Sequence, residues 1–153
     1  MTGAPKKCPV IIIRTLTKPF RNTLTVQYDE LCGRILELED SIRFVALADH
    51  LGLLIATVYR EGLVPLATKE ETAKYAGQLV LLTGAVSGGK FMSRVGKMQY
   101  VVGKFENLVR ATIPIVSDDY DKYYLLMSLD VDSDYVGAID KVLSFLRENH
   151  SAF

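Results

Sequence analysis

The chain of 153 residues is poor in the side chains that most catalytic and metal sites require. It contains two cysteines, two histidines and no tryptophan. Neither Cys8 nor Cys32 has another cysteine or a histidine at ligand spacing, which predicts two reduced thiols, with no disulfide framework and no metal site. The Gly-x-Ser-x-Gly nucleophile motif is also missing. We therefore expect no catalytic residue, no metal and no cofactor.

An excess of charge and a long apolar run are absent as well. Eighteen basic and 18 acidic residues cancel, so no overall field attracts nucleic acid or an anionic membrane. The uninterrupted apolar stretches are far shorter than the roughly 20 residues that cross a bilayer. The N-terminal run, Val10 to Ile13, is shorter than the apolar region of about 7 to 15 residues in a secretory signal. We expect a cytoplasmic protein without a membrane span.

Apolar residues make up 49% of the chain, which suits one domain with its own core. Residues 1–22 mix proline, lysine and threonine around the β-branched run Val10 to Ile13, and we interpret them as an N-terminal arm. The sequence leaves open whether this arm is an extra edge strand or is disordered. Residues 23–150 then form the domain.

The first half of the domain contains a helix, a hairpin and a second helix. Apolar residues at helical spacing predict an amphipathic helix over roughly residues 26–39. Two β-rich runs, Phe44–Ala48 and Leu53–Tyr59, flank the turn residues Asp49–Gly52. The glycine of that turn supplies positive φ and its aspartate can accept hydrogen bonds from the turn backbone, which predicts a hairpin.

A long helix is predicted to begin at about residue 69, because Thr68 and Glu71 have the spacing of a capping box. Gly77 and Gly84 interrupt its apolar pattern. Since a glycine inside a helix costs about 1 kcal/mol relative to alanine, we expect a close backbone neighbour to compensate. That neighbour is either a strand of the same sheet or the matching helix of a second copy. The residues Ser87-Gly88-Gly89 are predicted to end the helix.

The second half of the domain contains three strands and a helix. Strands are predicted over Met98–Phe105 and Leu108–Val116, with a tight connection between them, and over Tyr123–Asp130 after an acidic loop. Asp134 and its neighbours cap a final helix, and the last five residues are expected to fray. The order helix, two strands, long helix, three strands, helix predicts an α+β fold with one five-stranded antiparallel sheet.

This order, the hairpin FVALADHLGLLIAT and the helix that begins after Thr68 resemble the roadblock, or dynein light chain, family of the profilin-like and longin-like group. The resemblance covers residues 25–148. The stretch YVVGKFENLVRATIPI is similar to uncharacterised archaeal roadblock-like proteins. The arm, the glycine-rich end of the long helix and the segment after it depart from a minimal member.

The resemblance implies a homodimer that pairs through the long helix and the third strand. It also implies a non-catalytic adaptor or regulator of a small GTPase in a motor or signalling complex. The dimer interface carried over to this sequence comprises Ala73, Gly77, Val80, Gly84, Tyr100, Val101 and Val102. The alternative is a small-molecule sensor of PAS-like type, because PAS-like and longin domains share much of this order. Five tyrosines would then line its cavity, at positions 59, 75, 100, 123 and 124.

The segment GAVSGGKF raises a third hypothesis, a phosphate-binding loop. Gly84, Gly89 and Lys90 have P-loop spacing, but Phe91 stands where a Ser or Thr must hold magnesium. The capping box also places Leu79 to Leu82 inside a helix, and the chain after them is too short for crossover helices. Nucleotide binding is therefore the least favoured function. A weaker form remains open beside a simple helix terminus, in which the segment binds an anion or a partner's acidic loop. The residues concerned are Ser87, Gly88, Gly89, Lys90 and Arg94.

Overall fold

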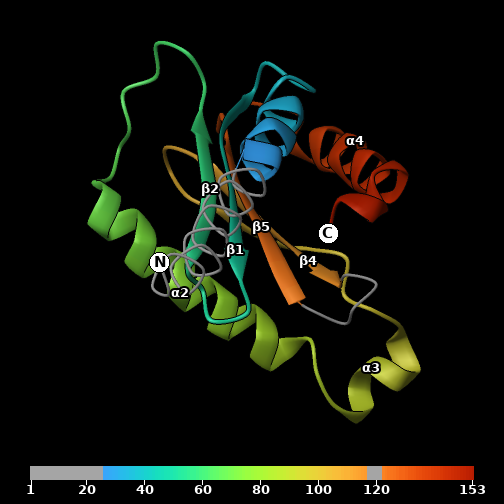
Figure 1. The fold of residues 1–153 in the computed structure, drawn as a ribbon. Helices are drawn as coiled ribbons and strands as arrows, with labels where there is room; N and C mark the ends of the chain where they lie inside the picture. The colour runs from blue at the N-terminus through green and yellow to red at the C-terminus, as the bar shows by residue number, and fades with distance from the viewer. Residues whose placement is uncertain (1–25, 117–121) are drawn as a thin grey trace, which may run out of the picture.

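The computed structural model describes residues 26–116 and 122–153, so the N-terminal arm and the acidic loop lie outside the described residues. One antiparallel sheet has the strand order β2-β1-β5-β4-β3 (Figure 1). The strands are β1 (Ile42–Asp49), β2 (Leu54–Tyr59), β3 (Val101–Lys104), β4 (Val109–Val116) and β5 (Lys122–Leu129). Residues 26–36 are helical, followed in the chain by α2 (Lys69–Val86), α3 (Lys90–Val95), α4 (Tyr135–Glu148) and the 3-10 turn η1 (His150–Ala152). The predicted fold class is confirmed.

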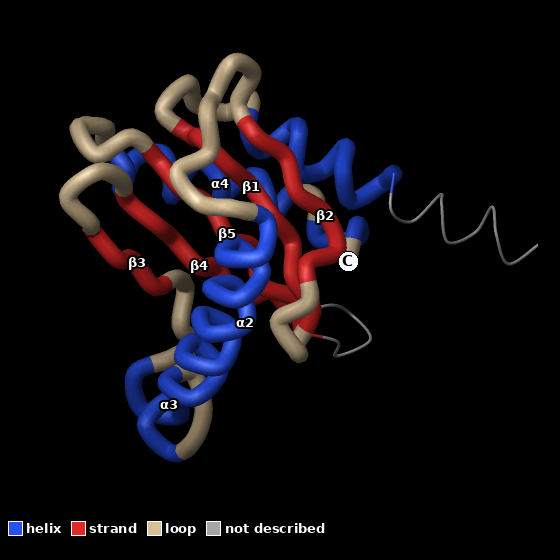
Figure 2. Tube along the Cα trace, turned by 90° about the vertical axis from the view of Figure 1, so that its left-hand side faces the viewer, coloured by secondary structure: helices blue, strands red, loops and turns tan. Residues whose placement is uncertain are grey.

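Helices cover both faces of the sheet. Figure 2 shows α2 in front of the strands and α4 behind them. Successive side chains of β1 point to opposite faces of the sheet, because a β-strand is pleated. Val45 and Leu47 join the core shared with the helix over 26–36 and α4, whereas Ala46 and Ala48 join the smaller core under α2.

The local signals in the sequence act as expected. The Thr68 hydroxyl accepts a hydrogen bond from the Glu71 N–H at 3.2 Å, and the Glu71 carboxylate accepts one from the Thr68 N–H at 2.8 Å. This is the predicted capping box. In the hairpin, Asp49 Oδ1 accepts hydrogen bonds from the N–H groups of Leu51 and Leu53, each at 2.9 Å. Both predictions are confirmed.

A pair of glycines brings the hairpin turn against α2. Gly52 has φ +82°, and a Cβ built on it would lie 2.6 Å from the Cα atom of Gly77. Real Cβ atoms do not approach backbone that closely, so the turn reaches the helix only because residue 52 is glycine. The close neighbour expected at Gly77 is therefore the β1–β2 turn of the same chain.

Three elements differ from the sequence-based expectation. β3 begins at Val101 rather than Met98, because the chain arrives from an unpredicted helix, α3, bounded by the positive-φ glycines Gly89 and Gly96. The first helix ends at residue 36. The C-terminal residues are ordered by packing, since the Phe153 ring lies 6.5 Å from that of Tyr28 and 6.0 Å from that of Tyr123. In the part of the chain that the structure describes, no helix has the length and apolar character to span a membrane.

Candidate interaction surface

The outer edge of β3 is the first component of the candidate surface. Among the strands that the structure describes, β3 is the last of the sheet and pairs with β4 alone. Its first two residues, Val101 and Val102, are half-buried. A strand in this position presents a row of unpaired N–H and C=O groups, which forms a template for another strand.

An apolar stripe on α2 is the second component. Tyr75, Leu79, Leu82 and Val86 follow each other at intervals of four, three and four residues, so they share one side of the helix. We call this set the β3-side stripe, because the guanidinium carbon of Arg110, on β4, lies 4.3 Å from the centroid of the Tyr75 ring. Leu82 and Val86 remain 55% and 50% exposed. The stripe and the open edge of β3 thus lie on the same side of the molecule.

The interface residues expected from the sequence are separated by the fold. Tyr100, Val101 and Val102 are half-buried at the β3 edge, and Ala73 and Gly84 are exposed on α2. Two others need correction. Val80 is only 2% exposed and belongs to the core under α2, so it cannot meet a partner. Gly77 lies against the β1–β2 turn, on the side of α2 away from β3. Periodicity identifies a face of a helix but not the sheet edge toward which its flanks point.

Arg110 is a half-buried cation with no acidic partner among residues 26–116 and 122–153. Among the described residues it makes no ion pair and no hydrogen bond, and its contact is the Tyr75 ring. Burial lowers the pKa of its guanidinium, against the opposing influence of Tyr75 and Tyr59. Arg110 and Tyr75 border a groove of about 450 Å³ with Leu66, Phe105 and Glu106, so the groove already contains one acidic side chain, although Glu106 makes no ion pair with Arg110. A carboxylate from a partner would offset the hydration that the guanidinium loses on burial.

A basic and apolar segment follows α2. Residues 87–105 contain Lys90, Arg94, Lys97 and Lys104 and no aspartate or glutamate. No residue of α3 is buried, and both Phe91 and Val95 are largely exposed. Because α2 is one helix from Lys69 to Val86, the P-loop hypothesis has no strand before its glycines.

The five residues of the predicted anion contact all lie on this segment. The hydroxyl of Ser87 donates to the Gly84 carbonyl oxygen at 3.4 Å, whereas Gly88, Gly89, Lys90 and Arg94 are exposed.

The tyrosines considered for a sensor do not share one cavity. Tyr123 and Tyr124 border a cleft of about 420 Å³ between the α3–β3 connection and the C-terminal end of α4. Tyr75 borders the groove at Arg110, and Tyr59 borders a pocket of about 30 Å³, roughly the size of a water molecule. A ligand enclosed by this whole set of side chains is therefore not supported.

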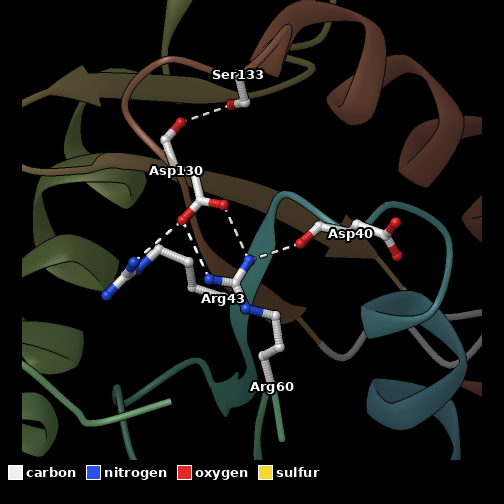
Figure 3. A network of polar contacts seen from close by, with 5 residues as sticks. All are labelled: Asp40, Arg43, Arg60, Asp130 and Ser133. Carbon is white, nitrogen blue, oxygen red and sulfur yellow. Dashed lines mark hydrogen bonds and ion pairs between the residues drawn. The ribbon is translucent and has the colours of Figure 1, made fainter. Parts of the chain in front are cut away.

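An ion network that sequence reasoning missed joins three strands at one end of the sheet (Figure 3). Asp130 accepts hydrogen bonds from Arg43 at 3.0 Å and from both terminal nitrogens of Arg60, at 2.9 and 3.2 Å. The hydrogen bond from Arg60 lowers the pKa of the Asp130 carboxyl group, with Arg43 adding to the effect against desolvation. Since each group is paired, the network holds β1 and β2 to the end of β5 and leaves no free acid or base for chemistry.

Cys32 has a strongly raised pKa. Its side chain is fully buried, and burial, with a smaller contribution from Asp29, raises the pKa of its thiol to about 12. Such a thiol is not a nucleophile at neutral pH. Within the described ranges, no three His, Cys, Asp or Glu residues gather closely enough to hold a metal ion.

Comparison with solved structures identifies the fold. The chain is similar to "MglB with tetrameric arrangement", with a TM-score of 0.59 and 14% identity over 83% of this chain and 93% of that one. It is also similar to a roadblock/LC7 domain from Streptomyces avermitilis, with a TM-score of 0.57 and 14% identity over 78% of this chain and 94% of that one. For MglC from Myxococcus xanthus the TM-score is 0.56 and the identity 12%, over 83% and 99% of the two chains. No family model matches the sequence, and no curated protein does.

Proposed function

We propose that this chain, which has the roadblock/LC7 fold, is a non-catalytic interaction module that forms a homodimer and regulates a small GTPase or a related motor or signalling complex. The similarity to MglB, MglC and a roadblock/LC7 domain supports this proposal at the level of fold. The observation that carries it is the open β3 edge beside the exposed β3-side stripe of α2. An open strand edge and an exposed apolar stripe on one side of a small domain favour a protein partner over a small ligand.

The dimer is proposed to form by antiparallel pairing of two β3 strands about a twofold axis. This pairing satisfies the edge N–H and C=O groups of Tyr100, Val101 and Val102, and it continues the sheet across the two copies. It also brings the two β3-side stripes toward each other, so that Leu82 and Val86 lose their exposure. Ala73 and Gly84, on the far flank of α2, lie at most at the margin of this interface.

The experiment that tests the dimer is the solution mass measured by light scattering after gel filtration. We expect a dimer at micromolar concentration, converted to a monomer by Leu82→Asp with Val86→Asp, because two carboxylates would be buried without partners. The matched control is Leu81→Asp, which lies on the same helix about 100° away from Leu82 and is 72% exposed. A monomeric wild-type protein, or equal effects of the two variants, contradicts the proposal.

The contact with the GTPase is proposed to use the basic segment at α3. Exposed Lys90 and Arg94 stand beside the exposed apolar side chains Phe91 and Val95, a combination that suits an acidic loop with an apolar anchor. Ser87, Gly88 and Gly89 contribute backbone groups next to it. Arg110 offers a second site, where its guanidinium would donate hydrogen bonds to a carboxylate of the partner.

This contact is tested by purifying the native protein from its source and identifying a co-purifying small GTPase by mass spectrometry. The recovered GTPase is then measured against purified variants by titration calorimetry. Lys90→Glu with Arg94→Glu is expected to weaken binding at least tenfold. Lys69→Glu with Lys74→Glu adds the same charge elsewhere and should change it little. Equal weakening by both pairs, or the absence of any GTPase, removes this part of the proposal without affecting the dimer.

A further inference from the structure

The opposite edge of the sheet, formed by β2, lacks the features that protect an edge strand. β2 is the last strand on its side, and its sequence LIATVY contains neither a charge nor a proline. Natural proteins usually block such an edge with lysine, proline or a bulge that turns it away, or cover it. The one irregularity in its pairing with β1 lies at the turn end, between Leu47 and Ala48. Most of the β2 edge is therefore a regular, uncharged template.

The backbone groups that point outward from β2 can be assigned. The Arg60 N–H donates to the Arg43 carbonyl oxygen at 2.9 Å, so Arg60 faces β1. Inward and outward backbone groups alternate along an antiparallel strand, which turns Val58 toward β1 and the N–H groups of Thr57 and Tyr59 away from it. Leu51 and Leu53, at the turn end of the same edge, are 67% and 64% exposed. An added strand at this edge would gain both hydrogen bonds and apolar contact.

We propose that the chain's own residues 10–13, Val-Ile-Ile-Ile, add to β2 as a sixth strand. The run is β-branched and uncharged, and Pro9 precedes it, which suits the beginning of an edge strand. The 12 residues from 14 to 25 can span about 40 Å when extended, twice the length of about 20 Å for β2. Figure 2 shows the helix over 26–36, where the described chain begins, on the β2 side of the sheet and far from β3.

The β3 edge is the less suitable place for this run. β3 has only four residues, one of which is Lys104, whereas the β2 edge has six residues and no charge. Strand addition at β2 does not depend on the proposed dimer, which uses the other edge. A covered β2 edge would also explain how a chain with an uncharged edge strand avoids pairing with itself.

Residue-level hydrogen exchange of the full chain, followed by NMR, tests the proposal. In the wild type we expect the Thr57 and Tyr59 amides to exchange at least 100-fold more slowly than unstructured amides. Ile11→Asp with Ile12→Asp should return both to nearly unstructured rates, while the Val58 amide, which is bonded to β1, stays protected. Thr15→Asp with Thr17→Asp adds the same charges outside the run and should leave Thr57 and Tyr59 slow.

Two results would overturn the proposal. One is fast exchange of Thr57 and Tyr59 in the wild type, which would show an open edge. The other is protection that survives Ile11→Asp with Ile12→Asp, which would indicate that a second copy's β2 covers the edge instead.

A spin label on Cys8 distinguishes an arm that folds back on its own chain from one exchanged between copies. Cys32 is fully buried, so labelling of the native protein is selective for Cys8. In chains that carry both the spin label and the isotope, we expect the label to broaden the signals of Thr57 and Tyr59. In a mixture of spin-labelled chains without isotope and isotope-enriched chains without label, we expect these signals to stay sharp. Broadening in the mixture would contradict folding back, because the labelled arm would then lie on the β2 edge of another copy. Broadening in neither sample would contradict strand addition altogether.

Discussion

Replacing Gly52 by alanine tests the contact between the hairpin turn and α2. Gly52 has φ +82°, a conformation that costs an L residue about 1–2 kcal/mol. The new Cβ would also lie 2.6 Å from the Gly77 Cα atom, and backbone cannot rotate away as a side chain does. Relieving such an overlap costs typically about 1–3 kcal/mol. We therefore expect Gly52→Ala to lower the free energy of unfolding by about 2–5 kcal/mol.

Gly62 provides the matched control for this prediction. It has φ +73°, and a Cβ built on it meets no described atom within 4 Å. Gly62→Ala should therefore show only the backbone cost of about 1–2 kcal/mol. Urea unfolding followed by circular dichroism measures both variants, provided that their unfolding slopes match. If the two substitutions cost the same, the turn does not rest on the helix backbone and our reasoning about this pair is wrong.

Three further predictions concern the cap, the ion network and the buried thiol. Thr68→Ala removes one half of the capping box and should lower stability by about 1 kcal/mol in the same urea assay, whereas Thr68→Ser should be nearly neutral. The pKa of Asp130 is lower folded than unfolded, so its contribution is present above the unfolded value of about 3.9 and is lost as the pH falls through the lower folded value. Asp130→Asn should flatten the loss of stability below about pH 5, with a small effect because the carboxylate is 40% exposed; an unchanged pH profile would contradict the network. Cys32 should resist a thiol reagent in the native protein at pH 8 and react fully in urea, and rapid native labelling of this residue would contradict its burial.

Much of the fold follows from signals that lie close together in the sequence. The Asp49 turn and the Thr68 cap depend on hydrogen bonds between neighbours, which any sequence reader can match to residue types. The order of helices and strands along the chain then follows from the number and spacing of apolar runs, whereas the strand order within the sheet depends on pairing between distant segments. α3 was not predictable in this way, because its six residues bury nothing and are bounded only by positive-φ glycines that also suit a loop.

Only part of the candidate surface could be predicted from the sequence. The resemblance predicted the β3 edge at Tyr100 to Val102. Which side of α2 lies next to that edge depends on tertiary packing. Ala73, Gly77 and Gly84 share a stripe of small residues, and such a stripe reports a close neighbour without naming it. In this protein the neighbour of Gly77 is Gly52 of the same chain. The side facing β3 is instead marked by Tyr75, whose role becomes visible only with Arg110 beneath its ring.

The contact between the two glycines has a mechanical consequence. Gly52 meets the backbone of Gly77 with no side chain of either residue between them, so a small shift of the helix at this point must move the turn or open a gap. The turn lies at the end of β2, while the opposite flank of the same helix faces β3. We therefore expect a partner that displaces α2 from the β3 side to shift the β1–β2 turn as well. In this way α2 would couple the β3 edge of the sheet to the β2 edge.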